Sequence, residues 1–118
     1  MGAIKTFKEL EIWKKGIELV KEVYKLTEKF PDSELYGLTS QMRRCAVSMP
    51  SNVAEGFRRK HSKEFKQFLN VALGSLAELE TQIIIAKELG YLEDGRENHI
   101  AELTDHTSRM IATLLKKL

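Results

Sequence analysis

Few side chains in this sequence of 118 residues are of the types that catalyse reactions or bind metals. Cys45 is the single cysteine and lies among apolar residues without a histidine close by in sequence, so we interpret it as a small buried hydrophobic side chain. Glu102 and His106 could share one face of a helix, but two ligands are too few for a stable metal site. There is no phosphate-binding glycine loop and no Glu-x-x-His pair. We therefore expect no enzyme activity, no metal and no cofactor.

Basic side chains give the clearest indication of binding. Residues 1–66 carry 14 Lys and Arg against 9 Asp and Glu, whereas residues 67–118 carry 5 against 8. The densest stretch contains seven basic side chains, namely Arg43, Arg44, Arg58, Arg59, Lys60, Lys63 and Lys66. This asymmetry favours an anionic partner such as nucleic acid, with a solvated loop and helix end as the alternative interpretation.

A helix should start inside this basic stretch. Ser62 is suited to cap it, and Glu64 falls in its first turn. The unpaired N–H groups and positive dipole end of a helix N-terminus favour phosphate, so neighbouring cations would reinforce an anion site there. We expect weak nucleic-acid binding with little sequence preference. Phe57 and Phe65 are better explained as core residues than as a stacking platform for single strands.

Four amphipathic segments must position these side chains. The first should begin at Thr6 and Glu9, which have the spacing of a capping box, and should end before Pro31. Its main apolar line runs through Leu10, Trp13, Ile17, Val20, Tyr24 and Thr27, with a second line of Ile12, Leu19 and Leu26.

Asp32 or Ser33 could cap the second helix, whose apolar line is Leu35, Leu38, Met42, Cys45 and Met49. Because the periodicity continues past Pro50 to Gly56, we predict a kinked helix there, with a full stop at Pro50 as the alternative.

The third helix should run from Ser62 to a Schellman end at Gly90 and Tyr91, along Phe65, Leu69, Ala72, Leu76, Leu79, Ile83 and Ala86. Asp94 and Glu97 could cap the fourth, whose apolar line is Ile100, Leu103, Thr107, Met110, Leu114 and Leu118. Nothing is typical of a strand. We predict an all-α fold with residues 1–118 forming a single domain, an antiparallel up-down-up-down four-helix bundle.

Some apolar residues exceed what such a core can bury. Ile83, Ile84 and Ile85 together cover about 200° of their helix, which is wider than one buried stripe. Phe68, Ile12 and Leu19 pose the same problem, and Gly74 in a helix interior suggests a close approach of another helix. We expect a homo-oligomer whose interface uses Phe68 and at least one of the three isoleucines.

One thiol and no long apolar run favour a cytoplasmic protein without a membrane segment. Gly2 formally fits a myristoylation pattern, but so short a pattern is commonly matched by chance, and Gly2 could be a remnant of cloning.

Three motifs resemble one bacterial family, the four-helix-bundle proteins encoded in 23S rRNA intervening sequences. They are YGLTSQMRR at 36–44, SMPSNVAEG at 48–56 and ALGSLAELET at 72–81, and the opening LEIW at 10–13 with Tyr24 also fits. The resemblance extends from about Phe7 to the end of the third helix and implies a bundle that assembles as a ring, often a pentamer. It also implies a relationship to the accessory protein of diversity-generating retroelements, which binds nucleic acid and a reverse transcriptase.

The resemblance brings no catalytic residues with it, and the matched positions Asn52, Glu55, Gly56, Gly74 and Glu78 are interpreted as architectural. The sequence therefore predicts a homo-oligomer that binds nucleic acid, most simply structured RNA or an RNA–DNA intermediate, through phosphate contacts. The alternative is a non-catalytic scaffold that binds a partner protein such as a polymerase.

Overall fold

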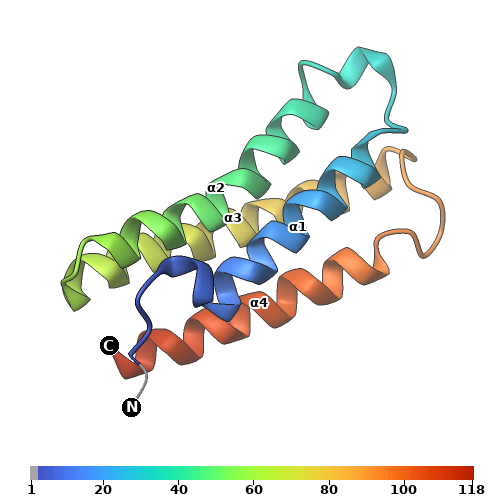
Figure 1. Ribbon diagram of the computed structural model, residues 1–118. Coiled ribbons are helices and arrows are strands. Elements are labelled where there is room, and N and C mark those ends of the chain that lie inside the picture. The colour runs from blue at the N-terminus through green and yellow to red at the C-terminus, as the bar shows by residue number, and fades with distance from the viewer. Residues whose placement is uncertain (1–2) are drawn as a thin grey trace.

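The chain folds into four long helices, as the apolar periodicity predicts (Figure 1). The computed structural model describes residues 3–118, so the expectation about Gly2 lies outside the described residues. The helices are α1 (Glu11–Thr27), α2 (Leu38–Arg58), α3 (Ser62–Glu88) and α4 (Asn98–Lys117). Two short 3-10 helices, η1 (Phe7–Glu9) and η2 (Asp32–Glu34), precede α1 and α2. Residues 3–118 contain no strand, and the all-α prediction is confirmed.

Consecutive helices lie side by side and run in opposite directions (Figure 1). Helices α1 and α3 each pack against both α2 and α4. At one end of the α1–α2 pair, Arg43 Nε donates to Thr27 Oγ1 over 2.9 Å. At the far end of α2, Gly56 lies against Phe65 and Phe68 of α3. These contacts place the α2–α3 turn at the end of the bundle where α1 begins and α4 finishes.

Helix α1 differs from expectation at its start and on its buried face. The capping box of Thr6 and Glu9 forms, but it caps η1, and α1 begins after Leu10. The buried line contains Ile12 and Leu19, whereas Ile17 and Tyr24 of the predicted main line are exposed. The reason is Gly16, which lets α1 approach α2 so closely that an added Cβ would lie 2.7 Å from Met49 Sδ.

Helix α2 starts later than predicted and continues through its proline. Asp32 and Ser33 lie in η2 and do not cap α2, because Glu34 Oε1 accepts the hydrogen bond from the Leu38 N–H instead (3.0 Å). The helix runs unbroken past Pro50, which is buried against Gly16, so the alternative of a full stop at Pro50 is wrong. A bend at Pro50 stays a prediction.

Helix α3 has the predicted core line from Leu69 to Ala86 and the predicted end. Gly90 has φ +78°, and the Tyr91 N–H donates to Ala86 O over 2.9 Å, which completes a Schellman motif. Its start is corrected by one residue, since His61 is the N-cap and Ser62 is already helical. By length and composition alone α3 could cross a membrane, a test that core helices also pass, and its apolar line packs on α2 and α4.

Helix α4 begins without the expected capping box. Glu97 stands at the N-cap position, but its carboxylate pairs with Lys87 Nζ of α3 over 2.9 Å and makes no cap hydrogen bond. Asp94 is exposed in the preceding turn. The α4 core line of Ile100, Leu103 and Thr107 is buried as predicted, and Thr104 and Ile111 complete it.

Candidate nucleic-acid interface

The α2–α3 turn brings five of the seven predicted binding residues to one end of the bundle. Arg58 ends α2, Arg59 and Lys60 form the turn, and Lys63 and Lys66 lie in the first turns of α3. All are exposed except Lys66, which is partly buried. Because α1 starts and α4 finishes at this end, their cations join the group (Figure 1). We call the whole set the basic end: Lys5, Lys8, Arg58, Arg59, Lys60, Lys63, Lys66, Lys116 and Lys117.

Lys5 contributes directly to this surface. An open hollow is lined by Lys5, Arg58 and Lys60 together with Phe7 and Phe57. The η1 turn holds the segment in place, because the Glu9 carboxylate accepts hydrogen bonds from the N–H groups of Lys5 and Thr6. Lys5, Lys8, Lys116 and Lys117 are distant from the basic stretch in sequence. The predicted antiparallel topology could have placed these four lysines at the basic end, because it brings the start of the first helix and the end of the fourth to the same end of the bundle.

The arginines of the turn rest on aromatic rings. The Arg58 guanidinium lies 5.4 Å from the centre of the Phe7 ring, and that of Arg59 lies 5.0 Å from the Phe68 ring. Arg59 also pairs with Glu55 at 3.7 Å and with Glu64 at 3.9 Å. These exposed pairs are long, and such pairs are worth little, so both arginines can reach an incoming anion.

The N-terminus of α3 adds backbone donors to these cations. Its N-cap, His61, makes no side-chain hydrogen bond to the first turn. Lys60 has φ +65°, a left-handed conformation that turns the chain sharply just before the helix. The first N–H groups of a 27-residue helix and its positive dipole end therefore emerge beside Arg59 and Lys60. This combination suits a phosphate group.

Arg43 and Arg44 do not belong to this surface, which corrects the prediction that they assist it. Fifteen helical residues separate Arg43 from Arg58, a distance of about 22 Å along α2. Arg43 is engaged locally by its bond to Thr27, and its guanidinium lies 4.5 Å from the centre of the Tyr24 ring. Arg44 is exposed.

The opposite end of the bundle is acidic. It carries Glu28, Asp32, Glu34, Glu88, Glu93, Asp94 and Glu97 against Lys25, Lys29, Lys87 and Arg96. Two of these carboxylates have structural partners. The Tyr91 hydroxyl donates to Glu34 Oε2 over 2.6 Å and lowers the pKa of Glu34, and the hydrogen bond from Lys87 lowers the pKa of Glu97. Charge is thus segregated along the long axis of the molecule.

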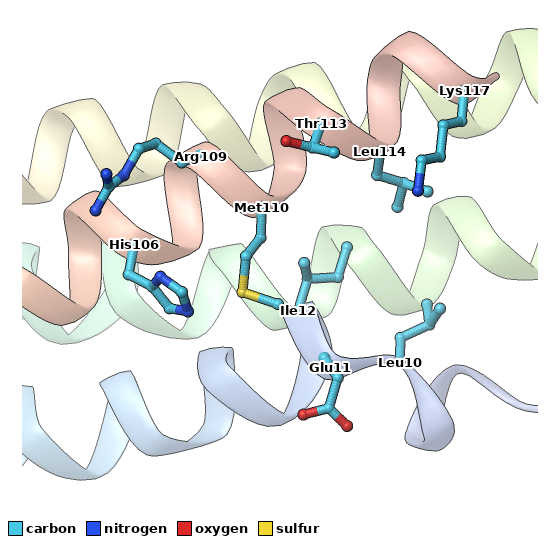
Figure 2. Close-up of a pocket in the computed structure, with 9 residues that line it drawn as sticks. All are labelled: Leu10, Glu11, Ile12, His106, Arg109, Met110, Thr113, Leu114 and Lys117. Atoms are coloured by element: carbon cyan, nitrogen blue, oxygen red, sulfur yellow. The ribbon is translucent and has the colours of Figure 1, made fainter.

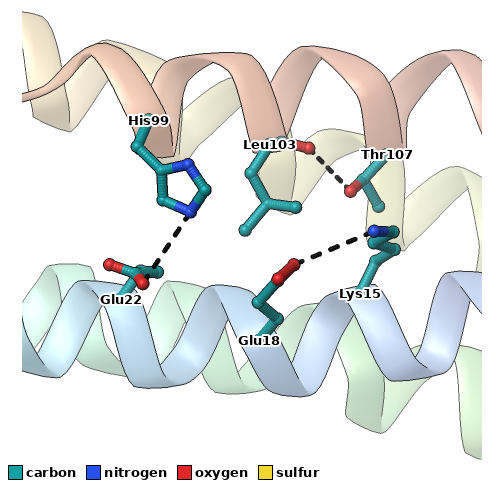
Figure 3. Close-up of polar contacts among 6 residues, drawn as sticks. All are labelled: Lys15, Glu18, Glu22, His99, Leu103 and Thr107. Atoms are coloured by element: carbon teal, nitrogen blue, oxygen red, sulfur yellow. Dashed lines mark hydrogen bonds and ion pairs between the residues drawn. The ribbon is translucent and has the colours of Figure 1, made fainter.

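An open groove lies between the start of α1 and the end of α4 (Figure 2). Ile12 and Met110 point toward each other at its floor, and His106 and Arg109 stand on the α4 side. Arg109 pairs with Asp105 over 3.0 Å. Farther along the same two helices, His99 Nε2 lies 3.8 Å from Glu22 Oε1, and Lys15 lies 3.9 Å from Glu18 (Figure 3). The contact of His99 with Glu22 joins α4 to α1, whereas the other two pairs each lie within one helix.

Cys45 has the properties of a core residue. It is buried, its Sγ donates to Ser75 O over 2.9 Å, and burial raises its pKa to about 11. A thiol in this state is a poor nucleophile. Within residues 3–118, no three His, Cys, Asp or Glu side chains are grouped so that they could hold a metal ion.

The apolar residues predicted for an interface fall into different environments. Ile84 and Ile85 are 62% and 43% exposed, which confirms that the isoleucine run exceeds what the core can bury. Ile83, by contrast, is only 4% exposed and belongs to the core of its own chain, as do Ile12 and Leu19. Phe68 is half-buried against Gly56. Ile83 is therefore not available to a second subunit, whereas Ile84 and Ile85 are.

Comparison with known proteins agrees with the fold. The family model described as 23S rRNA-intervening sequence protein matches residues 8–113, which span all four helices up to the last turn of α4. No curated protein matches the sequence. Because the matched segment includes nearly the whole chain, the protein belongs to the family of 23S rRNA-intervening sequence proteins.

Proposed function

We propose that this protein is a homo-oligomer that binds nucleic acid, in particular structured RNA, through phosphate contacts at the basic end. The observation that carries the proposal is the convergence of two chain segments, which brings Lys5 to the same hollow as Arg58 and Lys60, next to the uncapped N-terminus of α3. The family name associates its members with 23S rRNA intervening sequences, which is consistent with a nucleic-acid-related role.

Recognition in this proposal depends on charge and shape. The aromatic residues nearest the basic end are occupied within the chain, since Phe7 packs on Trp13 at 5.4 Å and Phe57 on Phe65 at 6.0 Å between ring centres. They are therefore poorly placed to stack on splayed bases, as proteins that bind single strands require. Phosphates of a duplex or a folded RNA are the fitting targets.

Oligomerisation would strengthen an otherwise weak site. One basic end offers only a few phosphate contacts, and several copies in one assembly raise the overall affinity through effective concentration. A pentameric ring is the arrangement implied by the family resemblance. In such an assembly the basic ends of all subunits would engage one RNA.

The test compares the triple variant Arg58→Ala/Arg59→Ala/Lys60→Ala with a control of equal charge, Lys25→Ala/Lys29→Ala/Arg96→Ala at the acidic end. Fluorescence anisotropy with a duplex at several salt concentrations gives the slope of log affinity against log salt. We expect the first variant to weaken binding to all sequences about equally and to flatten the slope by up to about 0.9 per lost contact on duplex DNA, while the control changes little. Unchanged affinity and slope, with the oligomer intact, would favour the protein scaffold instead.

A further inference from the structure

Two helix faces remain unpartnered at the acidic half of the bundle. The first lies on α2 and its neighbours and lines an open hollow. Tyr36 is 92% exposed there, and Tyr24, Leu35 and Val47 are exposed as well. Arg43 and Arg44 provide its charge, and residues 35–54 contain no Asp or Glu. We call this surface the tyrosine–arginine face, consisting of Tyr24, Leu35, Tyr36, Arg43, Arg44 and Val47.

The second face lies on α3. Val71, Gly74, Glu78 and Ile85 are exposed and follow each other at three-, four- and seven-residue steps, so they form one stripe along the helix. Leu89 extends the stripe beyond the helix end. Its charge is the opposite of the first face, because residues 67–86 contain Glu78 and Glu80 and no Lys or Arg. We call this stripe the isoleucine–glutamate face.

Gly74 lies in the middle of the second face. Nothing is within 4 Å of a Cβ added at this position, so no packing within residues 3–118 explains the glycine. Glycine in a helix interior costs about 1 kcal/mol relative to alanine. A close contact with the surface of another molecule would explain a glycine at this position.

The two faces also lie at matching levels along the bundle. The contact of Cys45 with Ser75 places Arg44, one residue away, within about one helical turn of the level of Glu78. At the acidic end of the bundle, the hydrogen bond between Tyr91 and Glu34 places Tyr36 near the level of Leu89 along the bundle axis. Rotation about an axis parallel to the bundle preserves these levels. Copies related in this way would bring Arg44 toward Glu78 and Tyr36 toward Leu89.

We infer that copies of this chain associate head to tail, with the tyrosine–arginine face of one covering the isoleucine–glutamate face of the next. This inference rests on the self-association in the proposed function and adds which surfaces meet. Contact between two tyrosine–arginine faces would bring arginines together, and contact between two isoleucine–glutamate faces would bring glutamates together, so each face favours the other. Within residues 3–118 neither Arg44 nor Glu78 has an ion-pair partner, and Glu78 Oε2 accepts a hydrogen bond from Gln82 Nε2 over 3.3 Å, so both charges are uncompensated. Two different faces generate a closed ring or an open filament.

The experiment uses two charge reversals, Arg44→Glu and Glu78→Arg, and measures mass by light scattering after size exclusion. Each variant alone should lose subunits at micromolar concentration, because like charges then meet at every contact. An equimolar mixture of the two variants should recover association, because the carboxylate introduced on α2 of one chain then meets the guanidinium introduced on α3 of the other. Recovery on mixing would show that the two side chains meet between different chains, because a contact within one chain would not change when the variants are mixed.

Lys21→Glu and Glu102→Arg, exposed on α1 and α4, are the matched controls and should keep the wild-type mass. Full association of either single variant, or no recovery on mixing, would overturn the assigned surfaces while leaving self-association intact. A monomeric wild-type protein would instead contradict the self-association in the proposed function. Circular dichroism of each variant verifies that the helices are retained.

Discussion

At the scale of single residues, glycines decide features that apolar spacing does not reveal. The sequence offers two apolar lines on α1, and the size of the side chains favours the line through Trp13 and Tyr24 as the main one. The structure buries the other line fully and leaves Ile17 and Tyr24 of the main line exposed, because Gly16 lies on the side of Ile12 and Leu19 and admits Met49 and Pro50 of α2. A glycine has no side chain that contributes to the apolar pattern of a helix, so the periodicity alone could not predict this close approach of α1 and α2.

Gly16→Ala should destabilise the protein. The added methyl group would lie 2.7 Å from Met49 Sδ and 2.8 Å from Pro50 Cβ, so α1 and α2 would have to separate. Overpacking of this kind costs about 1–3 kcal/mol, which exceeds the gain of about 1 kcal/mol in helix propensity. Urea unfolding at low protein concentration measures the change in the free energy of unfolding.

Gly74→Ala is the control for the same chemical change in open space. With no neighbour within 4 Å, it should stabilise the isolated chain by about 0.5–1 kcal/mol through helix propensity. Equal effects of the two substitutions would show that the contact between α1 and α2 at Gly16 is not tight.

At the scale of elements, the core lines of α3 and α4 and the end of α3 could be predicted from the sequence, and so could the α2 line except for Leu35, which is exposed before the helix begins. Several helix starts could not be predicted. Periodicity is a property of the segment itself, and a Schellman motif needs only local residues. Whether a side chain caps a helix depends on which hydrogen-bond or ion-pair partners the tertiary structure brings close to it. Glu97 pairs with Lys87 and does not cap α4, and Glu34 accepts the hydrogen bond of the Leu38 N–H in place of the predicted Asp32 or Ser33.

The pair of Lys87 and Glu97 should make stability depend on pH in the acid range. The hydrogen bond from Lys87 holds the pKa of Glu97 below its ordinary value of 4.5, so the unfolded state binds a proton more readily. The stabilisation is present above that ordinary value and is lost as the pH falls through the lower pKa of the folded state.

Glu97→Gln should therefore lower the free energy of unfolding at pH 7, and its difference from the wild type should become smaller as the pH is lowered to 3. Urea denaturation at both pH values measures this, with Glu93→Gln as a control that lacks an ion pair. A deficit that persists unchanged at pH 3 would show that the pair does not cause it.

At the scale of the whole molecule, topology decides which charges act together. The basic stretch from Arg43 to Lys66 looks continuous in sequence, yet α2 holds its two parts about 22 Å apart. The same antiparallel arrangement brings Lys5 to the hollow that Arg58 lines, and it brings the end of α4, with Lys117, to the start of α1. Counting charges along the chain therefore points to the turn residues and leaves out the cations of the neighbouring segments.

The most direct test of the central proposal is to locate the nucleic-acid contacts by NMR. Backbone amide shifts of the isotope-labelled protein are followed while an RNA duplex is added in low salt. We predict that the largest changes fall on the N–H groups of Ser62, Lys63 and Glu64 and on residues 58–60, and that they reverse when salt is raised. Changes confined to the acidic end or to the region of Arg43 and Arg44, or no change at all, would contradict the proposal.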